Sequence, residues 1–343
     1  MSISDQLIAR ICLRSMAVFV CVLAYGVWIA RAGFRIDRGL SGAAQSAWRL
    51  RISCLRAVSA LLIGLGAPVY CGAEPSIWLA LVFPPGVIAE GPDQGLGYTD
   101  QLVRAVLHHL SQYPITTASM PAVRELQLLQ KGGPYCTADL LKTTQRLEFL
   151  RFTSPFGYVL PIAMVVRAED KDHYDHFLDA NNMLSLDLLM RTDPGILGVS
   201  ARRTFGKMAD MVIAQVLAEN PNRIVQSYQE HSTEALLNLL AIHHVDAVLA
   251  FPIEEMYWSR HTGYGDSFYV YPIAESQELM PMRFSCTRQA ATDDLFTDLD
   301  VQAKSADLQH TFQLAYERWL PPYMLPLYRA RLNDNAKTPL VSK

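Results

Sequence analysis

The chain has 343 residues, of which 50% are hydrophobic and 18% charged, and its formal net charge at pH 7 is −3. A chain of this length can bury the cores of two modest domains. The first 73 residues hold eight Lys or Arg and two Asp or Glu, which leaves 22 basic and 31 acidic side chains in the remainder. Nucleic acid requires a basic footprint, so this acidic remainder excludes it as a partner.

Residues 1–73 concentrate the apolar side chains and are predicted to be a leader. The apolar stretch 16–30 lies between arginines but is short for a bilayer span, so membrane anchoring stays open. A second stretch, 57–73, follows a basic segment and ends in small residues, which is typical of a secretory signal. We therefore expect export with cleavage near Ala73, and a natural start near Leu50.

Four of the six cysteines fall in this leader, so the exported part keeps only Cys136 and Cys286. In an oxidising compartment two cysteines suggest one disulfide, and two buried free thiols are the alternative. No CxxC motif or Cys/His cluster with zinc spacing occurs, so we predict neither a metal site nor a cofactor.

The chain from residue 76 opens with a β-rich run that Pro84-Pro85 halts, followed by a glycine-rich loop. From Tyr98 onward, leucines and valines recur with helical spacing. A second helix is predicted to begin at Ser119-Pro121 and to end at Gly132-Gly133. Residues 158–167 read as a strand that crosses to a second lobe.

The region that follows alternates between strand and helix. The predicted elements are a strand at 195–199, a helix at 204–217, a strand at 224–228, a helix at 233–242 and a strand at 245–251. Such alternation favours a parallel sheet covered by helices. A return strand at 268–274, a strand at 282–287 and C-terminal helices that include 308–320 complete the chain, and these helices are expected to pack on the first lobe.

Two polar segments are candidates for ligand binding. Arg146 could offer a bidentate fork to a carboxylate, or it could simply form a surface ion pair with Glu148. The loop 198–206 leads from a strand into a helix whose amino end attracts anions, with Arg203 and Thr204 as further donors. An ordinary capped helix, with Ser200 as the N-cap, is the alternative for that loop.

The sequence contains few of the motifs that identify catalytic sites. The sequence has no GxSxG, GxGxxG or P-loop motif, and the adjacent histidines do not share a helix face. Glu254 and Glu255 are interpreted as solvated carboxylates on a surface turn. The chain is therefore predicted not to be an enzyme.

The segment Thr143-Thr144-Gln145-Arg146, followed by Phe152-Thr153-Ser154-Pro155-Phe156, resembles the extracellular solute-binding proteins of ABC transporters, of the polar amino-acid (family 3) type. The resemblance implies an α/β fold of the periplasmic-binding-protein-like type II, in which two α/β lobes are joined by two crossover strands. It also implies a disulfide between Cys136 and Cys286 within the first lobe. The lobes would close on a small ligand by hinge motion.

The resemblance also implies a set of ligand-binding residues, with Arg146 clamping a carboxylate from the first lobe and the 198–206 loop meeting it from the second. The full predicted set is Arg146, Thr143, Ser200, Arg203, Thr204, Phe83, Phe251 and Glu254.

The sequence departs from this family at two positions. Phe251 stands where amino-acid binders commonly have an acid that holds the α-ammonium group, and Leu141 stands near a position where a hydroxyl often contacts the carboxylate. The ligand is therefore expected to be a carboxylate or other anion without an α-amino group, unless Glu254 or Glu255 takes the place of the missing acid.

Together these features predict a leader at 1–73, lobe 1 at 74–166 and 272–330, lobe 2 at 167–271, and a tail at 331–343. The predicted function is a monomeric periplasmic receptor that captures a small carboxylate-bearing or amino-acid-like ligand for the membrane permease of an ABC transporter. The alternatives are a ligand-sensing or partner-docking protein of the same fold, and a cyclohexadienyl-dehydratase-like enzyme.

Overall fold

The computed structural model describes residues 75–201 and 203–337. The described residues all belong to one compact unit. The predicted leader, its cleavage near Ala73 and the end of the predicted tail lie outside the described residues. Within the described ranges, no helix combines the length and the apolar character needed to cross a membrane.

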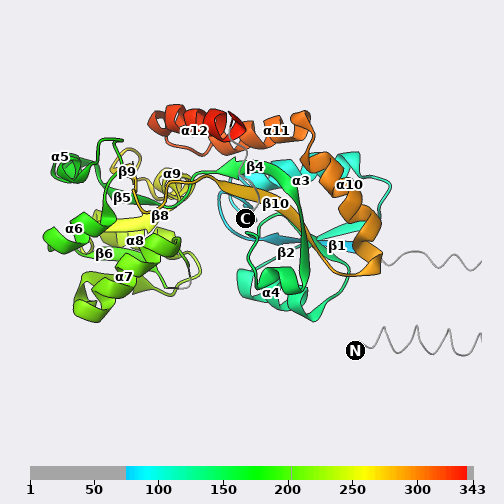
Figure 1. Ribbon diagram of the computed structural model, residues 1–343, viewed down its shortest axis with the longest axis horizontal. Helices are drawn as coiled ribbons and strands as arrows, with labels where there is room; N and C mark the ends of the chain where they lie inside the picture. The colour runs from blue at the N-terminus through cyan, green and yellow to red at the C-terminus, as the bar shows by residue number, and fades with distance from the viewer. Residues whose placement is uncertain (1–74, 202, 338–343) are drawn as a thin grey trace, which may run out of the picture. The chain divides into compact units, whose positions relative to one another are not determined.

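The first lobe is built on a five-stranded mixed sheet with the order β2-β1-β3-β10-β4. Its strands are β1 (Ser76–Leu81), β2 (Ile115–Met120), β3 (Tyr135–Thr137), β4 (Leu150–Val159) and β10 (Met280–Thr287). The strands β1, β2 and β3 are parallel, whereas β10 runs antiparallel to both β3 and β4. Figure 1 shows β4 and β10 as long neighbouring strands that extend from the first sheet toward the second.

The second lobe holds another five-stranded mixed sheet, with the order β7-β6-β8-β5-β9. Its strands are β5 (Ala163–Arg167), β6 (Leu197–Ser200), β7 (Ile224–Ser227), β8 (Ala247–Ala250) and β9 (Phe268–Pro272). Here β6, β7 and β8 are parallel, whereas β5 is antiparallel to β8 and β9. The sequence predicted parallel sheets, and the crossover strands supply the antiparallel part. The chain passes between the sheets twice, from β4 to β5 and from β9 to β10.

Helices cover both sheets. The first lobe has α3 (Tyr98–His109), α4 (Ala122–Lys131), α10 (Asp293–Ala303), α11 (Ala306–Glu317) and α12 (Leu325–Lys337). The second has α5 (Lys171–Tyr174), α6 (Leu186–Thr192), α7 (Lys207–Glu219), α8 (Ser232–Ala241) and α9 (Pro252–Thr262). As expected, the C-terminal helices pack on the first lobe, since α11 contacts α3 and β4 and α10 contacts β4.

The strands alternate between two apolar layers, as a period of two residues requires. In β5, Ala163 and Val165 belong to one core cluster and Met164 and Val166 to another, and all four side chains are buried. This two-sided burial explains why β5 reads as a continuous apolar run in the sequence.

The structure corrects two predicted elements and adds one that was not predicted. Ser119 lies in the edge strand β2 and does not begin a helix, and α4 starts only after Pro121. The polar sequence ITTASM lacks the alternation that announces a strand. The helix predicted from Thr204 begins at Lys207, after Gly206 with φ 99°, a backbone conformation that favours glycine. Helix α9 was not predicted at all.

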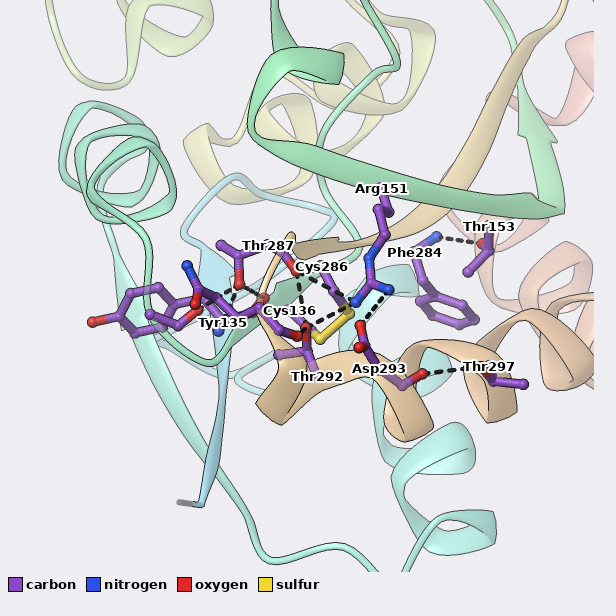
Figure 2. The surroundings of a disulfide bond; sticks show 12 residues. Tyr135, Cys136, Arg151, Thr153, Phe284, Cys286, Thr287, Thr292, Asp293 and Thr297 are labelled. Atoms are coloured by element: carbon purple, nitrogen blue, oxygen red, sulfur yellow. Dashed lines mark hydrogen bonds and ion pairs between the residues drawn. A yellow bond between two sulfur atoms is a disulfide. The ribbon is translucent and has the colours of Figure 1, made fainter. Parts of the chain in front are cut away.

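A disulfide joins Cys136 of β3 to Cys286 of β10, as the resemblance implied (Figure 2). The two residues are register partners in the antiparallel pair, with their Cα atoms 4.1 Å apart, and 150 residues separate them in the sequence. Beside the bond, Arg151 of β4 forms an ion pair of 2.6 Å with Asp293 of α10. The disulfide therefore links the strand before the first crossing to the strand after the second.

Replacing both cysteines, as Cys136→Ala with Cys286→Ala, should lower the free energy of unfolding by about 2–5 kcal/mol, because the closed loop is long and restricts the unfolded chain. Urea denaturation of the exported protein measures this loss. A reductant should destabilise the wild type by a similar amount and leave the double variant unchanged, and equal midpoints for wild type and variant in oxidising buffer would contradict the prediction.

Candidate functional site

The carboxyl ends of the parallel strands define where a ligand site is expected in each lobe. In the first lobe, β1 and β3 end at Leu81 and Thr137. In the second, β6 and β8 end at Ser200 and Ala250. The segments that follow these ends carry most of the predicted ligand-binding residues.

Arg203 and Glu254 form the strongest polar contact among the predicted site residues. Arg203 follows β6 and donates from Nη1 and Nη2 to the two carboxylate oxygens of Glu254, at 2.6 and 2.9 Å. Glu254 also accepts from the hydroxyl of Thr233, at 2.7 Å, and from the backbone N–H of Phe251, at 3.0 Å. Its side chain is only 3% exposed, so the paired and hydrogen-bonded carboxylate is satisfied within the protein.

Two aromatic rings lie beside the Arg203 guanidinium. Its central carbon lies 5.4 Å from the ring centre of Phe83 and 5.3 Å from that of Phe251, within the range of cation–π attraction. The two rings meet edge to face, with centres 6.4 Å apart. Because Phe83 follows β1 whereas Phe251 follows β8, this contact joins the first lobe to the second.

Ser200 and Thr204 bond within their own lobe. The Ser200 hydroxyl lies 2.8 Å from the hydroxyl of Ser232, at the start of α8, so Ser200 does not cap α7. Thr204 donates to Asp210, whose other carboxylate oxygen accepts the backbone N–H of Phe205 at 2.8 Å. Asp210 therefore occupies the amino end of α7 that the sequence suggested for an anion.

Arg146 and Thr143 lie together in the turn before β4. The backbone N–H of Arg146 donates to the Thr143 hydroxyl at 3.3 Å, and its Nη1 donates to the carbonyl of Leu141 at 2.7 Å. Arg146 is half-buried, and this loss of water lowers its pKa although the charge of Glu125 opposes the shift. Within residues 75–201 and 203–337, Arg146 forms no ion pair with a carboxylate at salt-bridge distance.

The sequence analysis missed an acidic pair in the first lobe. Glu125, in the first turn of α4, is fully buried, and Asp139 follows β3. The Thr137 hydroxyl lies 2.7 Å from Glu125 Oε1 and 3.3 Å from Asp139 Oδ2, and Asp139 Oδ2 also accepts the backbone N–H of Leu81 at 3.1 Å. An acid two residues after a buried strand can be recognised in a sequence as a candidate site residue. Asp139 was not recognised because the three-residue strand β3 was not predicted.

Glu254 and Glu255 were interpreted as solvated, and the structure corrects this because both are buried in the first turn of α9. Glu255 accepts a hydrogen bond of 2.8 Å from Ser259. Burial raises the pKa of Glu255 to about 7. Neither carboxylate is therefore free to replace the acid missing at Phe251.

Comparison with known proteins confirms the predicted fold. The second substrate-binding domain of a putative amino acid ABC transporter from Streptococcus pneumoniae matches 72% of this chain and 100% of its own, at 14% identity and a TM-score of 0.50. A probable amino-acid ABC transporter extracellular-binding protein from Bacillus subtilis matches over 72% and 97%, at 14% identity and a TM-score of 0.51. A histidine kinase sensor domain similar to periplasmic binding proteins matches over 72% and 97%, at 14% identity and a TM-score of 0.50.

No protein-family model and no curated protein sequence matches the chain. The likeness is therefore one of fold: two α/β lobes joined by two crossover strands, as in the amino-acid binding proteins of ABC transporters.

The buried Glu255 makes a pH-dependent prediction. Its pKa of about 7 in the folded protein exceeds that of an exposed glutamate, so the folded state binds this proton more tightly and stability falls as pH rises from about 4.5 through 7. Glu255→Gln should therefore raise the free energy of unfolding at pH 8 by up to about 3 kcal/mol and change it little at pH 4.5. Urea denaturation at the two pH values measures the difference.

Glu254→Gln serves as the control substitution, because Glu254 precedes Glu255 in the same turn of α9 but forms an ion pair. It removes one partner of the buried ion pair with Arg203 and should cost about 3 kcal/mol at pH 8. A Glu255→Gln variant that is less stable than the wild type at pH 8 would contradict the prediction.

Proposed function

We propose that this chain is a periplasmic receptor that captures a small polar, carboxylate-bearing solute for an ABC transporter. The observation that carries the proposal is the meeting of Phe83 from one lobe with Arg203 and Phe251 from the other, just beyond the carboxyl ends of the parallel strands. Sheets of this kind bind ligands beyond their carboxyl ends. The binding proteins with the same fold support the transport role.

In this proposal the ligand lies in the crevice beside these rings. Arg146 holds its carboxylate from lobe 1 with help from the Thr143 turn, because its guanidinium is half-buried and, among the described residues, donates only to the main-chain carbonyl of Leu141. The second lobe supplies the polar loop around Ser200, Arg203 and Thr204 and the aromatic face of Phe251. The predicted lobe boundaries at 166/167 and 271/272 fall inside β5 and β9 of the second sheet, so in this proposal lobe 2 extends over both strands, 163–272, and lobe 1 comprises the described residues on either side.

A sensory role is the second candidate, and the match to a histidine kinase sensor domain favours it. Both candidates require ligand binding and differ in the partner. Association of the ligand-loaded protein with a permease, or with a separate signalling protein, distinguishes them.

Thermal-shift screening of the exported protein against amino acids, organic acids and sulfonates tests the shared requirement. A true ligand should raise the melting temperature, because it binds the folded state alone, and calorimetry should give one site per chain. A folded protein that responds to no solute in this panel would count against the receptor role.

Arg146→Ala should weaken binding of the best carboxylate ligand about 10- to 100-fold, because a charge-assisted hydrogen bond contributes about 1.5–3 kcal/mol. Calorimetric titration measures this change. Arg124→Ala is the matched control, since Arg124 is exposed in the same lobe at the start of α4, and it should leave affinity unchanged. Equal affinities for Arg146→Ala and the wild type would refute the assigned role of Arg146.

A further inference from the structure

The second sheet has a free edge at β7. This strand is the first in the order β7-β6-β8-β5-β9, and among the described residues it pairs only with β6. The carbonyl of Ser227 accepts the backbone N–H of Ala201, just after β6, at 2.9 Å, so the main chain of Ser227 is directed to β6. Because main-chain groups alternate in direction along a strand, Ile224 and Gln226 direct theirs to the free edge.

A groove of about 510 Å³ lies between this strand and α8. It is lined by residues 225–229 and by Glu234, Ala235, Asn238 and Leu239 of α8. The four helical residues recur at intervals of one and four, so they share one face of α8, while other residues of the helix pack on the sheet. The volume of the groove is within the range of known ligand sites.

The groove offers groups that can bind a peptide main chain. The side-chain amides of Gln226, Gln229 and Asn238 each carry N–H donors and a carbonyl acceptor. The hydroxyl oxygen of Ser227 is buried, and among the described residues it has no hydrogen-bond partner, so an added peptide group would supply a missing contact. Tyr228 is 64% exposed and adds an apolar ring at the end of the strand. An extended peptide beside a sheet edge uses such main-chain bonds and side-chain contacts.

The charge around the groove is negative. Glu234 is the one charged side chain among the described lining residues, and the exposed Glu230 follows Gln229 in the chain. Arg223, just before β7, does not compensate these acids, because its guanidinium donates to the main-chain carbonyl of Gly195 at 3.0 Å. Complementary charge therefore favours a partner with basic side chains.

We propose that the groove between β7 and α8 docks an extended, basic segment of a partner protein, which adds a strand to the free edge of β7. The segment pairs with the main chain of Gln226 and places a lysine or arginine beside Glu234. The four residues of β7 match a segment about 13 Å long. The lining holds no cation for the terminal carboxylate of a free peptide, so a segment within a longer chain fits it better.

This groove is distinct from the solute site of the proposed function, since none of the residues assigned to that site lines it.

Chemical-shift titration of the isotope-labelled exported protein tests the proposal. The probe is a short peptide in which threonine and valine flank a central arginine, capped at both ends so that it carries no terminal charge. It should shift the amide signals of β7 and α8. The matched peptide with a central glutamate should bind at least about 5-fold more weakly, because its charge is repelled by Glu234. The arginine peptide with free termini should bind no more tightly than the capped one.

Gln226→Pro removes an N–H from the free edge and leaves the ladder to β6 intact, as an edge strand tolerates. It should weaken binding of the arginine peptide about 10-fold, because a main-chain hydrogen bond is lost and the edge is blocked. Gln226→Ala is the matched control, since it keeps the N–H, and it should change affinity by less than about 3-fold.

Glu234→Gln should weaken binding of the arginine peptide about 2- to 5-fold and reduce its advantage over the glutamate peptide. The control Asp172→Asn removes an exposed acid of α5 in the same lobe and should leave both affinities unchanged. Cooperative unfolding of each variant verifies its fold.

The proposal is wrong if the arginine peptide shifts no amide signal of residues 224–239 at millimolar concentration, or if Gln226→Pro binds it as tightly as Gln226→Ala does. Tighter binding of the peptide with free termini would assign the groove to a peptide solute and would also contradict the proposal. Sedimentation equilibrium tests a second copy of the chain as the occupant: a dimer that Gln226→Pro dissociates would overturn the assignment to a partner protein. None of these outcomes bears on the receptor role, because they probe other residues.

Discussion

The bidentate pair between Arg203 and Glu254 is the interaction on which the contact between the two lobes at Phe83 depends. It ties the loop after β6 to the first turn of α9, two elements about 50 residues apart in the sequence. Because Glu254 is buried, this geometry is maintained only while both oxygens keep their donors. The pair also holds the guanidinium against Phe83 and Phe251, so this contact between lobes depends on an ion pair made entirely within one of them.

A second link between lobes comes from the C-terminal part of the chain. Helix α11 packs on α3 and β4 of the first lobe, whereas the Tyr323 hydroxyl, just before α12, accepts the backbone N–H of Val270 in β9 at 2.8 Å. The Tyr323 ring also stacks on Tyr269, with centres 4.8 Å apart. Any closing motion of the two lobes must therefore preserve or exchange these contacts as well as bend the two crossover segments.

The sequence was sufficient to predict the order of the lobes, the disulfide and four residues that meet in the structure, Phe83, Arg203, Phe251 and Glu254. The fold and the disulfide are confirmed because apolar strands, helical periodicity and a family motif can be recognised in the sequence, whereas the ligand-binding role of the four residues stays a prediction. The features that were not predicted depend on contacts between residues that are distant in the sequence. The edge strand β2 is polar, β3 has only three residues, and the burial of Glu254 arises from an arginine far away in the chain. Asp139 was not singled out for the same reason, since its contact with Leu81 is seen only when β3 is known to lie beside β1.

The charged side chains described above are paired differently in the two lobes. In lobe 2, Arg203 and Glu254 neutralise each other, so this side of the crevice offers mainly aromatic surface and satisfied polar groups. In lobe 1, Arg146 donates to a backbone carbonyl, and the charges of Arg146 and Glu125 shift each other's pKa without a hydrogen bond between them, so they are paired less tightly than Arg203 and Glu254. A ligand gains most where charge is uncompensated, because its own charge then replaces a missing partner and breaks no existing one. On the proposed function, a charged solute would therefore gain more from Arg146 of lobe 1 than from the ion pair of lobe 2, where binding would have to break an existing contact.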